Sequence, residues 1–277
     1  MSSVMTTHDA PPATTPPTGR AIVLDGVSKT YDVKGGGAPV TALTSVDLTL
    51  RAGEFFSLVG PSGCGKSTLL NVVAGLLDAS TGQTRIGDRT VSGPDRATGI
   101  VFQKATLLTW LTIEENVLLP SKIAKRLDDE TRARADHLFE LAGLADFRKR
   151  YPSELSGGMQ QRASIVRALV GDPDVLLMDE PFSALDEFTR EGLNDELMRL
   201  WTDSPKTVVF ITHNIAEAVY LSDRVGVMTS RPGTLKEIVD VPLARPRGPE
   251  LRSDEHFYEL VSRIRGLIGH HHEGTNR

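Results

Sequence analysis

Several short, almost continuously apolar runs punctuate the chain, each bounded by polar or turn-forming residues. Such runs predict strands that are buried on both faces, which is typical of a parallel sheet. They occur at residues 55–59, 99–102, 175–178, 208–211 and 225–228, and residues 235–241 are expected to complete the sheet. Segments with helical spacing lie between them, so the chain favours an α/β fold with a parallel-sheet core.

A different pattern marks the N-terminal part of the chain. Apolar and polar residues alternate through 42–50, and a shorter apolar set lies within 21–31. Residues 83–91 have the pattern of a hairpin closed by Gly-Asp, while residues 33–39 carry the glycines and proline of a flexible loop. Half-buried strands joined by tight turns predict an antiparallel β subdomain beside the parallel core.

Helical spacing dominates residues 104–170. Leu138, Leu141 and Ala142 recur at helical intervals with charged residues between them, and a Gly-Asp-Pro break follows residue 170. We therefore predict an inserted α-helical subdomain over this segment. Further helices are predicted at 69–77, 187–201 and 215–221, and an amphipathic one at 255–268. The apolar stripe of that last helix could pack on the chain itself or on a partner.

The candidate chemistry begins between the run at 55–59 and the helix predicted after it. This phosphate loop consists of Gly60, Pro61, Ser62, Gly63, Cys64, Gly65, Lys66, Ser67 and Thr68. Glycines let successive backbone N–H groups point at one centre, and the helix that follows adds its positive end. Lys66 supplies a cation for the β- and γ-phosphates, and the Ser67 hydroxyl is a ligand for Mg²⁺. The chain is therefore predicted to bind ATP and Mg²⁺.

Two carboxylates follow the apolar run at 175–178. Asp179 stands where an acid at a strand end reaches the metal beside a phosphate loop. Glu180 is a second carboxylate at the same strand end and is placed to accept a proton from an attacking water. In isolation the pair could equally start a helix, but the phosphate loop favours the catalytic interpretation.

A second anion site is predicted at residues 155–162, Leu-Ser-Gly-Gly-Met-Gln-Gln-Arg. Ser156 caps a predicted helix, and Gly157 and Gly158 leave its first N–H groups open. The alternative is an ordinary capped helix start. A single subunit does not obviously need two anion sites, so the segment raises the question of what the second one serves.

Composition limits which partners, disulfides and membrane segments the chain can be expected to have. The formal net charge of −5 over 277 residues, with acids and bases interspersed, gives no reason to expect nucleic acid as a partner. The single cysteine, Cys64, excludes an internal disulfide; it is either a small residue in a tight turn or a reactive thiol. No apolar run approaches the roughly 20 residues that span a bilayer, and residues 1–19 form a Pro/Thr-rich tail without the apolar stretch of a secretory signal.

With these motifs in order, the chain resembles the ATP-binding cassette family of transporter ATPases, which have a P-loop NTPase (RecA-like) core. The segment 155–162 is similar to the family's signature motif, with Met159 where the commoner version has Gln. The resemblance implies that Ser156, Gly157 and Gly158 bind the γ-phosphate held by a second copy of the chain. It covers about residues 21–240.

The same resemblance implies roles for four further residues. Gln103 is similar to the family's Q-loop glutamine, which contacts Mg²⁺ and water, and His213 to its switch histidine, which contacts the γ-phosphate. Asp186 falls in the counterpart of the D-loop at the dimer interface. Tyr31 stands at the place of the aromatic that stacks on adenine; a core tyrosine is the alternative. Catalysis is thus assigned to Glu180, His213, Gln103 and Lys66, and metal binding to Ser67, Gln103 and Asp179.

Within the family, residues 102–117, 228–233 and 241–249 resemble importer ATPases of the nitrate/sulfonate/taurine group. This implies a peripheral subunit on the cytoplasmic face of the cell membrane, partnered by permease subunits and indirectly by a solute-binding protein. We expect a tail at 1–19, an ATPase domain at 20–245 and a C-terminal helix and tail at 246–277. The alternatives are an exporter or lipid-extraction ATPase, a soluble cassette ATPase and a P-loop kinase.

Overall fold

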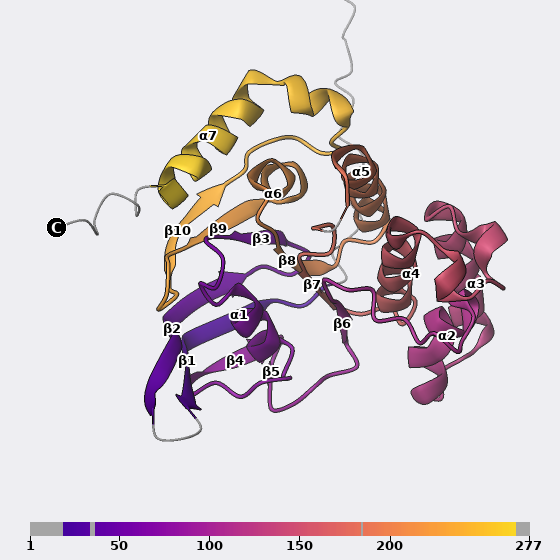
Figure 1. Ribbon diagram of the computed structural model, residues 1–277, viewed down its shortest axis with the longest axis horizontal. Coiled ribbons are helices and arrows are strands. Elements are labelled where there is room, and N and C mark those ends of the chain that lie inside the picture. The colour runs from indigo at the N-terminus through magenta and orange to yellow at the C-terminus, as the bar shows by residue number, and fades with distance from the viewer. Residues whose placement is uncertain (1–18, 34–36, 184, 270–277) are drawn as a thin grey trace, which may run out of the picture.

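The computed structural model describes residues 19–33, 37–183 and 185–269 (Figure 1). Its strands are β1 (Ile22–Val33), β2 (Gly37–Leu50), β3 (Phe55–Val59), β4 (Thr81–Ile86), β5 (Arg89–Thr90), β6 (Thr98–Val101), β7 (Val175–Asp179), β8 (Thr207–Ile211), β9 (Arg224–Met228) and β10 (Leu235–Asp240). Its helices are α1 (Lys66–Val73), α2 (Ile113–Ile123), α3 (Asp129–Leu141), α4 (Gly157–Leu169), α5 (Glu187–Asp203), α6 (Ile215–Leu221) and α7 (Glu255–Gly269). Short 3-10 helices occupy Ala145–Phe147, Pro152–Glu154 and Pro249–Ser253.

The apolar runs form a six-stranded sheet in the order β10-β9-β3-β8-β7-β6. Its strands are parallel except β10, which pairs antiparallel with β9. Alternate residues of β3 enter different cores: Phe55 joins the cluster that contains α5, α6 and α7, and Phe56 joins the cluster that contains α1. Both faces are therefore covered, which explains why these strands are apolar throughout rather than alternating.

The alternating strands form a four-stranded antiparallel sheet in the order β2-β1-β4-β5. Ile22, Val46 and Leu50 face the same cluster as α1, so α1 lies between the two sheets (Figure 1). The hairpin β4–β5 is confirmed. The predicted loop at 33–39 is shorter than expected, because β1 continues to Val33 and β2 begins at Gly37.

The helices α2, α3 and α4 lie to one side of the sheets and carry a core of their own (Figure 1). Ile113, Phe139 and Val166 are members of this third cluster, one from each helix, whereas Ile165 of α4 faces the core of the large sheet. Because α4 contributes to both cores, it connects the helical region to the strand that carries Asp179. These helices fall within residues 104–170, where a helical subdomain is predicted.

The first helix differs from its prediction at both ends. It begins at Lys66, inside the phosphate loop, and ends at Val73 rather than continuing to Leu77. Gly75 has φ +68°, and a Cβ there would lie 2.3 Å from the backbone oxygen of Gly93. Contact with the loop after β5 therefore ends the helix, which the local apolar pattern did not reveal.

The amphipathic helix α7 packs on its own chain. Phe257, Leu260, Val261 and Ile264 are buried in the cluster that contains α6. The first of the two alternatives for this stripe is therefore correct. The predicted tail at 1–19 lies outside the described residues except for Gly19, as do His270, His271 and His272.

Candidate functional site

The phosphate loop curls between the carboxyl end of β3 and the start of α1. Gly63 and Gly65 have φ values of +73° and +102°, which side-chain-bearing residues rarely adopt. A Cβ on Gly65 would lie 2.7 Å from Leu43, so the antiparallel sheet also requires glycine there. The Lys66 ammonium, only 6% exposed as a residue, donates to the backbone oxygens of Gly60 (2.9 Å) and Pro61 (3.1 Å). The cation is thus held at the mouth of the loop.

Ser67 and Asp179 come together as predicted from the sequence. The Ser67 hydroxyl donates to Asp179 Oδ1 over 3.0 Å, joining the phosphate loop to the end of β7. Burial raises the pKa of Asp179, the Ser67 hydrogen bond opposes that rise, and the neighbouring Glu180 charge adds to it. The Ser67 hydroxyl and the Asp179 carboxylate, whose charged form is disfavoured by burial, are hard oxygen donors of the kind that Mg²⁺ prefers.

This pair fits a metal that is completed by other oxygens. Within the described ranges, no cluster of three or more His, Cys, Asp or Glu side chains could hold a metal ion. Mg²⁺ is commonly held by one or two protein oxygens together with substrate phosphates and water. The donor set therefore fits Mg²⁺ bound with a nucleotide better than a metal bound by the protein alone.

Glu180 sits in a strained turn directly after β7. Its φ of +44° is unusual for a residue with a side chain, and its N–H donates to the Ile211 oxygen over 2.9 Å. The Oε2 of Glu180 lies 3.2 Å from Nδ1 of His213, which follows β8. Adjacent parallel strands thus bring the predicted base and the predicted switch histidine into contact.

Gln103 makes no hydrogen bond to Ser67 or Asp179 within the described part of the chain. Its amide donates instead to the Ser183 hydroxyl over 3.1 Å. The physical reason is its position: it lies beyond β6, the edge strand, and turns toward the segment that follows Glu180. The structure therefore does not bring Gln103 to the Ser67–Asp179 pair.

A cavity of ≈ 400 Å³ opens over the phosphate loop. Besides loop residues, it is lined by Tyr31, Val40, Ala42, Glu180 and Arg231. Tyr31 is 40% exposed, and its hydroxyl lies 3.4 Å from that of Thr68. It is therefore available at the rim rather than packed in the core. Cys64, by contrast, is 1% exposed and is buried beneath the loop.

Arg231 is a site residue that sequence reasoning missed. Its Nε donates to the Gly63 oxygen over 3.2 Å, which brings the loop after β9 against the phosphate loop. A Cβ on Gly233 would lie 1.8 Å from the Cys64 oxygen, so the two loops touch directly. The segment 228–233 was noted only for its resemblance, and nothing in its local pattern predicts this contact.

The signature segment, Ser156, Gly157 and Gly158, lies apart from this cavity. Ser156 caps α4 by accepting from the Met159 N–H over 3.3 Å, as predicted. Gly157 is exposed, and a Cβ there would meet nothing within 4 Å. None of the three lines the phosphate-loop cavity, and α4 is well separated from α1 (Figure 1). The two predicted anion sites are therefore not parts of one site within the chain.

Asp186 starts α5 on the segment that follows Glu180. Its carboxylate accepts from the Thr189 N–H (3.0 Å) and hydroxyl (2.7 Å), and these bonds hold the pKa of Asp186 below its usual value. The side chain is exposed and is committed to capping. The structure places it outside the phosphate-loop cavity.

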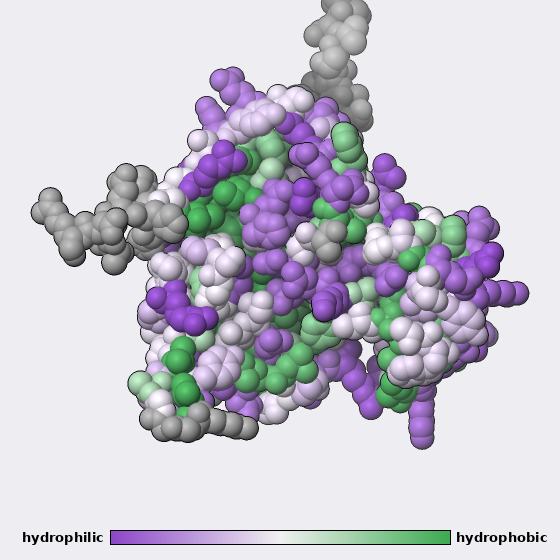
Figure 2. Space-filling view, viewed as in Figure 1, coloured by the Kyte–Doolittle hydropathy of each residue, from purple (hydrophilic) through white to green (hydrophobic). Residues whose placement is uncertain are grey.

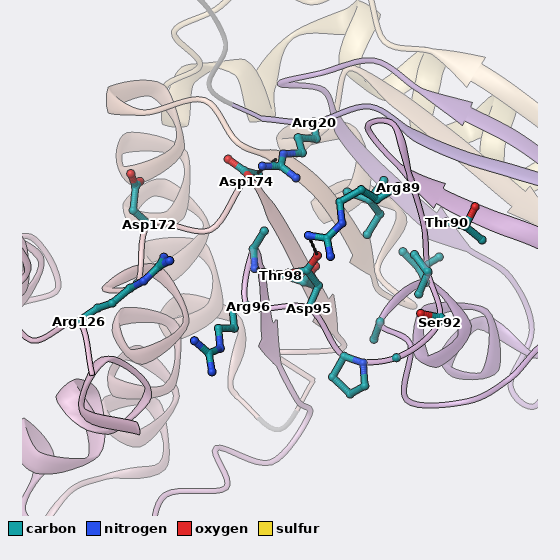
Figure 3. A pocket seen from close by; sticks show the side chains of 18 residues that line it. Arg20, Arg89, Thr90, Ser92, Asp95, Arg96, Thr98, Arg126, Asp172 and Asp174 are labelled. Atoms are coloured by element: carbon teal, nitrogen blue, oxygen red, sulfur yellow. Dashed lines mark hydrogen bonds and ion pairs between the residues drawn. The ribbon is translucent and has the colours of Figure 1, made fainter. Parts of the chain in front are cut away.

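A larger cavity, of ≈ 590 Å³, lies at the opposite edge of the sheet (Figure 3). It adjoins Thr98 and Asp174, near the amino ends of β6 and β7. Two of its carboxylates are already paired with arginines, Arg20 with Asp174 (2.8 Å) and Arg89 with Asp95 (3.2 Å). It contains none of the predicted site residues, so size alone does not identify the functional site.

The surface does not offer a single broad apolar face in the view shown. Hydrophobic residues emerge in separate areas, between α7 and β10, over the helical region and at the β1–β2 hairpin, with hydrophilic residues between them (Figure 2). Among the helices formed by the described residues, none has the length and apolar character needed to cross a membrane.

Comparison with known proteins agrees with this geometry. The family described as ABC transporter matches residues 43–183. A taurine import ATP-binding protein of Jannaschia sp. is 40% identical over 251 residues, covering 89% of this chain and 93% of the relative. A bicarbonate transport ATP-binding protein of Synechocystis sp. is 43% identical over 246 residues, covering 86% of each.

A solved structure adds the three-dimensional likeness. It is a dimeric ATP-binding cassette in a post-hydrolysis state bound to ADP and Pi, with a TM-score of 0.70 and 34% identity. The match covers 80% of this chain and all of that cassette. The predicted P-loop NTPase fold is therefore confirmed.

Proposed function

The chain belongs to the ABC transporter family, and from that membership we propose that it is the ATP-hydrolysing, energy-coupling subunit of an importer. Relatives of this chain at about 40% identity are named for taurine and bicarbonate import or transport. Taurine and bicarbonate are both small solutes with an anionic group. We propose a small anionic solute of this kind, sulfonate and nitrate included, as the cargo of the complete system.

The observation that carries the proposal is the convergence at one sheet edge. The phosphate loop, the Ser67–Asp179 pair and the Glu180–His213 pair follow β3, β7 and β8, which are neighbours in the sheet. Parallel strands end at the same edge, where α/β proteins bind their ligands. These groups supply what phosphoryl transfer to water requires: charge neutralisation, a metal site and a base.

Lys66 and the loop N–H groups neutralise the phosphate charge of ATP. To reach the β- and γ-phosphates, the Lys66 ammonium exchanges its bonds to the loop oxygens for bonds to phosphate. Ser67 and Asp179 hold Mg²⁺, joined by Gln103 if its amide leaves Ser183. The metal, when bound, neutralises developing charge on the phosphate oxygens. Tyr31 stacks on the adenine at the rim of the cavity.

Glu180 is the general base. Its carboxylate accepts the proton of the attacking water while His213, 3.2 Å away, orients the carboxylate and contacts the γ-phosphate. The backbone of Glu180 has a strained φ, which directs its side chain toward His213. This φ persists because hydrogen bonds around Glu180 hold it.

Two copies of the chain complete the site. Helix N-termini with free N–H groups bind anions, and Gly157 is exposed at the start of α4, whereas Gly158, expected to be open as well, is buried. We place this segment against the phosphate loop of a second copy, with Asp186 at the boundary. The dimeric state of the related cassette supports this arrangement.

The helical region contacts the permease subunits on the cytoplasmic face of the membrane. Trp110 is 71% exposed on the segment before α2, whereas its neighbour Leu111 is half-buried. Asn116 fixes this segment: it is fully buried, accepts from the Leu108 N–H and donates to the backbone oxygens of Leu108, Leu111 and Thr112. Trp110 is thus presented on a rigid loop, as a partner contact requires.

A capture experiment tests this function. Glu180→Gln with ATP is used as bait on solubilised membranes of the native source, and Ser156→Arg with ATP is the matched control that should not close. Recovery of a small polytopic permease, with a solute-binding protein, is expected with the first bait only. Recovery of a large soluble complex without any membrane protein would contradict the transport role and leave the ATPase role standing.

A further inference from the structure

Next to His213, the structure holds a buried carboxyl group that the proposed mechanism does not use. Glu217 of α6 is 5% exposed. Its Oε2 accepts a short hydrogen bond from the hydroxyl of Thr212, the residue before His213. The same hydroxyl accepts from the Asn214 N–H over 3.0 Å, and Asn214 Oδ1 accepts from the Glu217 N–H over 3.1 Å. Two hydrogen bonds therefore join Glu217 to the turn that carries His213, and a third closes the turn itself.

The other oxygen of this carboxyl faces a different helix. Glu217 Oε1 is buried without a partner, and so is Asn194 Oδ1 on α5. Asn194 and Arg190 of α5, together with His213, lower the pKa of Glu217, so all three lie near its carboxyl. Two buried acceptors left unpaired cost free energy. One proton on Glu217 lets the carboxyl donate to Asn194 and satisfies both atoms.

Burial supplies the reason for that proton. It raises the pKa of Glu217 against the Thr212 hydrogen bond, the Arg190 charge, the Asn194 contact and the His213 charge. A neutral carboxyl that both donates and accepts is a suitable link between two elements in a dry interior. A glutamate exposed to water would not link two elements in this way.

We propose that Glu217 is a positioning residue for His213, because with Thr212 and Asn194 it ties the turn carrying His213 to α5. The inference rests on the proposed ATPase function. Asp186 is the N-cap of α5, on the segment that also carries Glu180, so the link connects the switch histidine to the helix next to the proposed dimer boundary. A displacement of α5 on dimer closure is then transmitted to the contact between His213 and Glu180.

A double-mutant cycle with His213 tests this role. Glu217→Leu removes both hydrogen bonds at similar volume and is expected to lower kcat by about ten- to a hundredfold, since small displacements at a reacting centre have effects of that size. ATP affinity, measured by equilibrium binding, should stay unchanged. In a His213→Ala background the same substitution should change the residual single-turnover rate by less than about twofold, because Glu217 acts through His213.

Conservative replacement separates positioning from general stability. Glu217→Gln can accept from Thr212 and donate to Asn194, so it should retain kcat within about twofold, judged beside the control Glu140→Leu on the exposed face of α3. Equal loss of kcat from Glu217→Leu with and without His213 would overturn the inference, as would a Glu217→Gln rate as low as that of Glu217→Leu. If Glu217→Leu does not fold, the Gln variant decides. A wild-type chain that hydrolyses no ATP would instead sink the proposed function itself.

Discussion

The phosphate loop and the signature segment are both helix N-termini built to hold an anion, yet their surroundings differ. Around the phosphate loop, the groups of one chain are bonded to one another: Lys66 to loop oxygens, Ser67 to Asp179, and Glu180 to His213. Around the signature segment, Ser156 caps its own helix and Gly157 is exposed, whereas Gly158 is buried against Thr189 of α5. The fold of one chain brings the groups around the phosphate loop together. It leaves the signature segment without such partners.

The difference teaches how a nucleotide site can be divided between two copies. A site that is complete within one chain has no need of a second anion-binding helix end on a separate element. An element that presents an unpaired N–H donor at an exposed helix start is suited to a partner. On this account, substitutions around the phosphate loop (the assembled side) should impair the hydrolysis step itself. Substitutions in the signature segment (the open side) should impair only hydrolysis by the dimer.

The largest effect is expected on the assembled side, at Glu180. Glu180→Gln removes the base but keeps the shape of the side chain, so ATP should still bind while kcat falls by about 10²–10⁴-fold. Steady-state hydrolysis and equilibrium ATP binding measure the two quantities. Glu187→Gln, on the first turn of α5, is the control, and a Glu180→Gln rate equal to that of the control would remove Glu180 from the role.

On the open side, Ser156→Arg should lower hydrolysis by about a hundredfold without weakening ATP binding by the monomer. The bulky cation blocks approach of the partner's phosphate loop and does not touch the chain's own cavity. Ser153→Arg, on an exposed residue of the neighbouring 3-10 helix, should leave the rate unchanged. Loss of ATP binding in monomeric Ser156→Arg would show that the two regions share a site within the chain.

A smaller effect is expected for Tyr31 at the cavity rim. Tyr31→Ala should weaken ATP binding by about two- to tenfold, which corresponds to the roughly 0.5–1.5 kcal/mol of an aromatic stack, whereas Tyr31→Phe should bind normally. Titration with ATP and with inorganic triphosphate distinguishes the interaction, because only ATP carries the base. Equal weakening for both ligands would argue against stacking.

The smallest effect concerns stability rather than rate. Burial raises the pKa of Asp179, so the folded chain holds that proton to higher pH than the unfolded chain, and the group loses stabilisation as pH rises through the folded pKa. Asp179→Asn should therefore raise Tm at neutral pH, where burial disfavours the charged carboxylate. The gain should vanish below the usual aspartate pKa, and Asp88→Asn should show none. A gain that persisted in acid would point to another cause.

The sequence predicts those parts of the fold that depend on interactions between residues close together in the chain. The strand β3 and helix α6 match their predicted bounds, because the apolar pattern and the capping by Asn214 are local. The early end of α1 at the Gly75–Gly93 contact did not follow, nor did the shift of Gln103 toward Ser183. Both depend on segments brought together only by the completed fold.

The candidate site shows the same division. Motif spacing was enough to bring Ser67 to Asp179, since it specifies which strands end beside the loop. It could not reveal the positive φ of Glu180 or the contact of Arg231 with the phosphate loop. A strained turn and a contact between distant loops leave no periodic pattern in the chain.

Mixing two inactive variants tests the divided site most directly. Lys66→Ala disables the phosphate loop and Ser156→Arg disables the signature segment, so each variant alone should hydrolyse ATP at about a hundredth of the wild-type rate or less. In a mixed dimer, the intact phosphate loop of one copy faces the intact signature segment of the other. Equimolar mixing should restore about a quarter of the wild-type rate, since half of randomly formed dimers are mixed and each has one of two sites intact. A mixture that stays as inactive as its components would contradict a site shared between two copies.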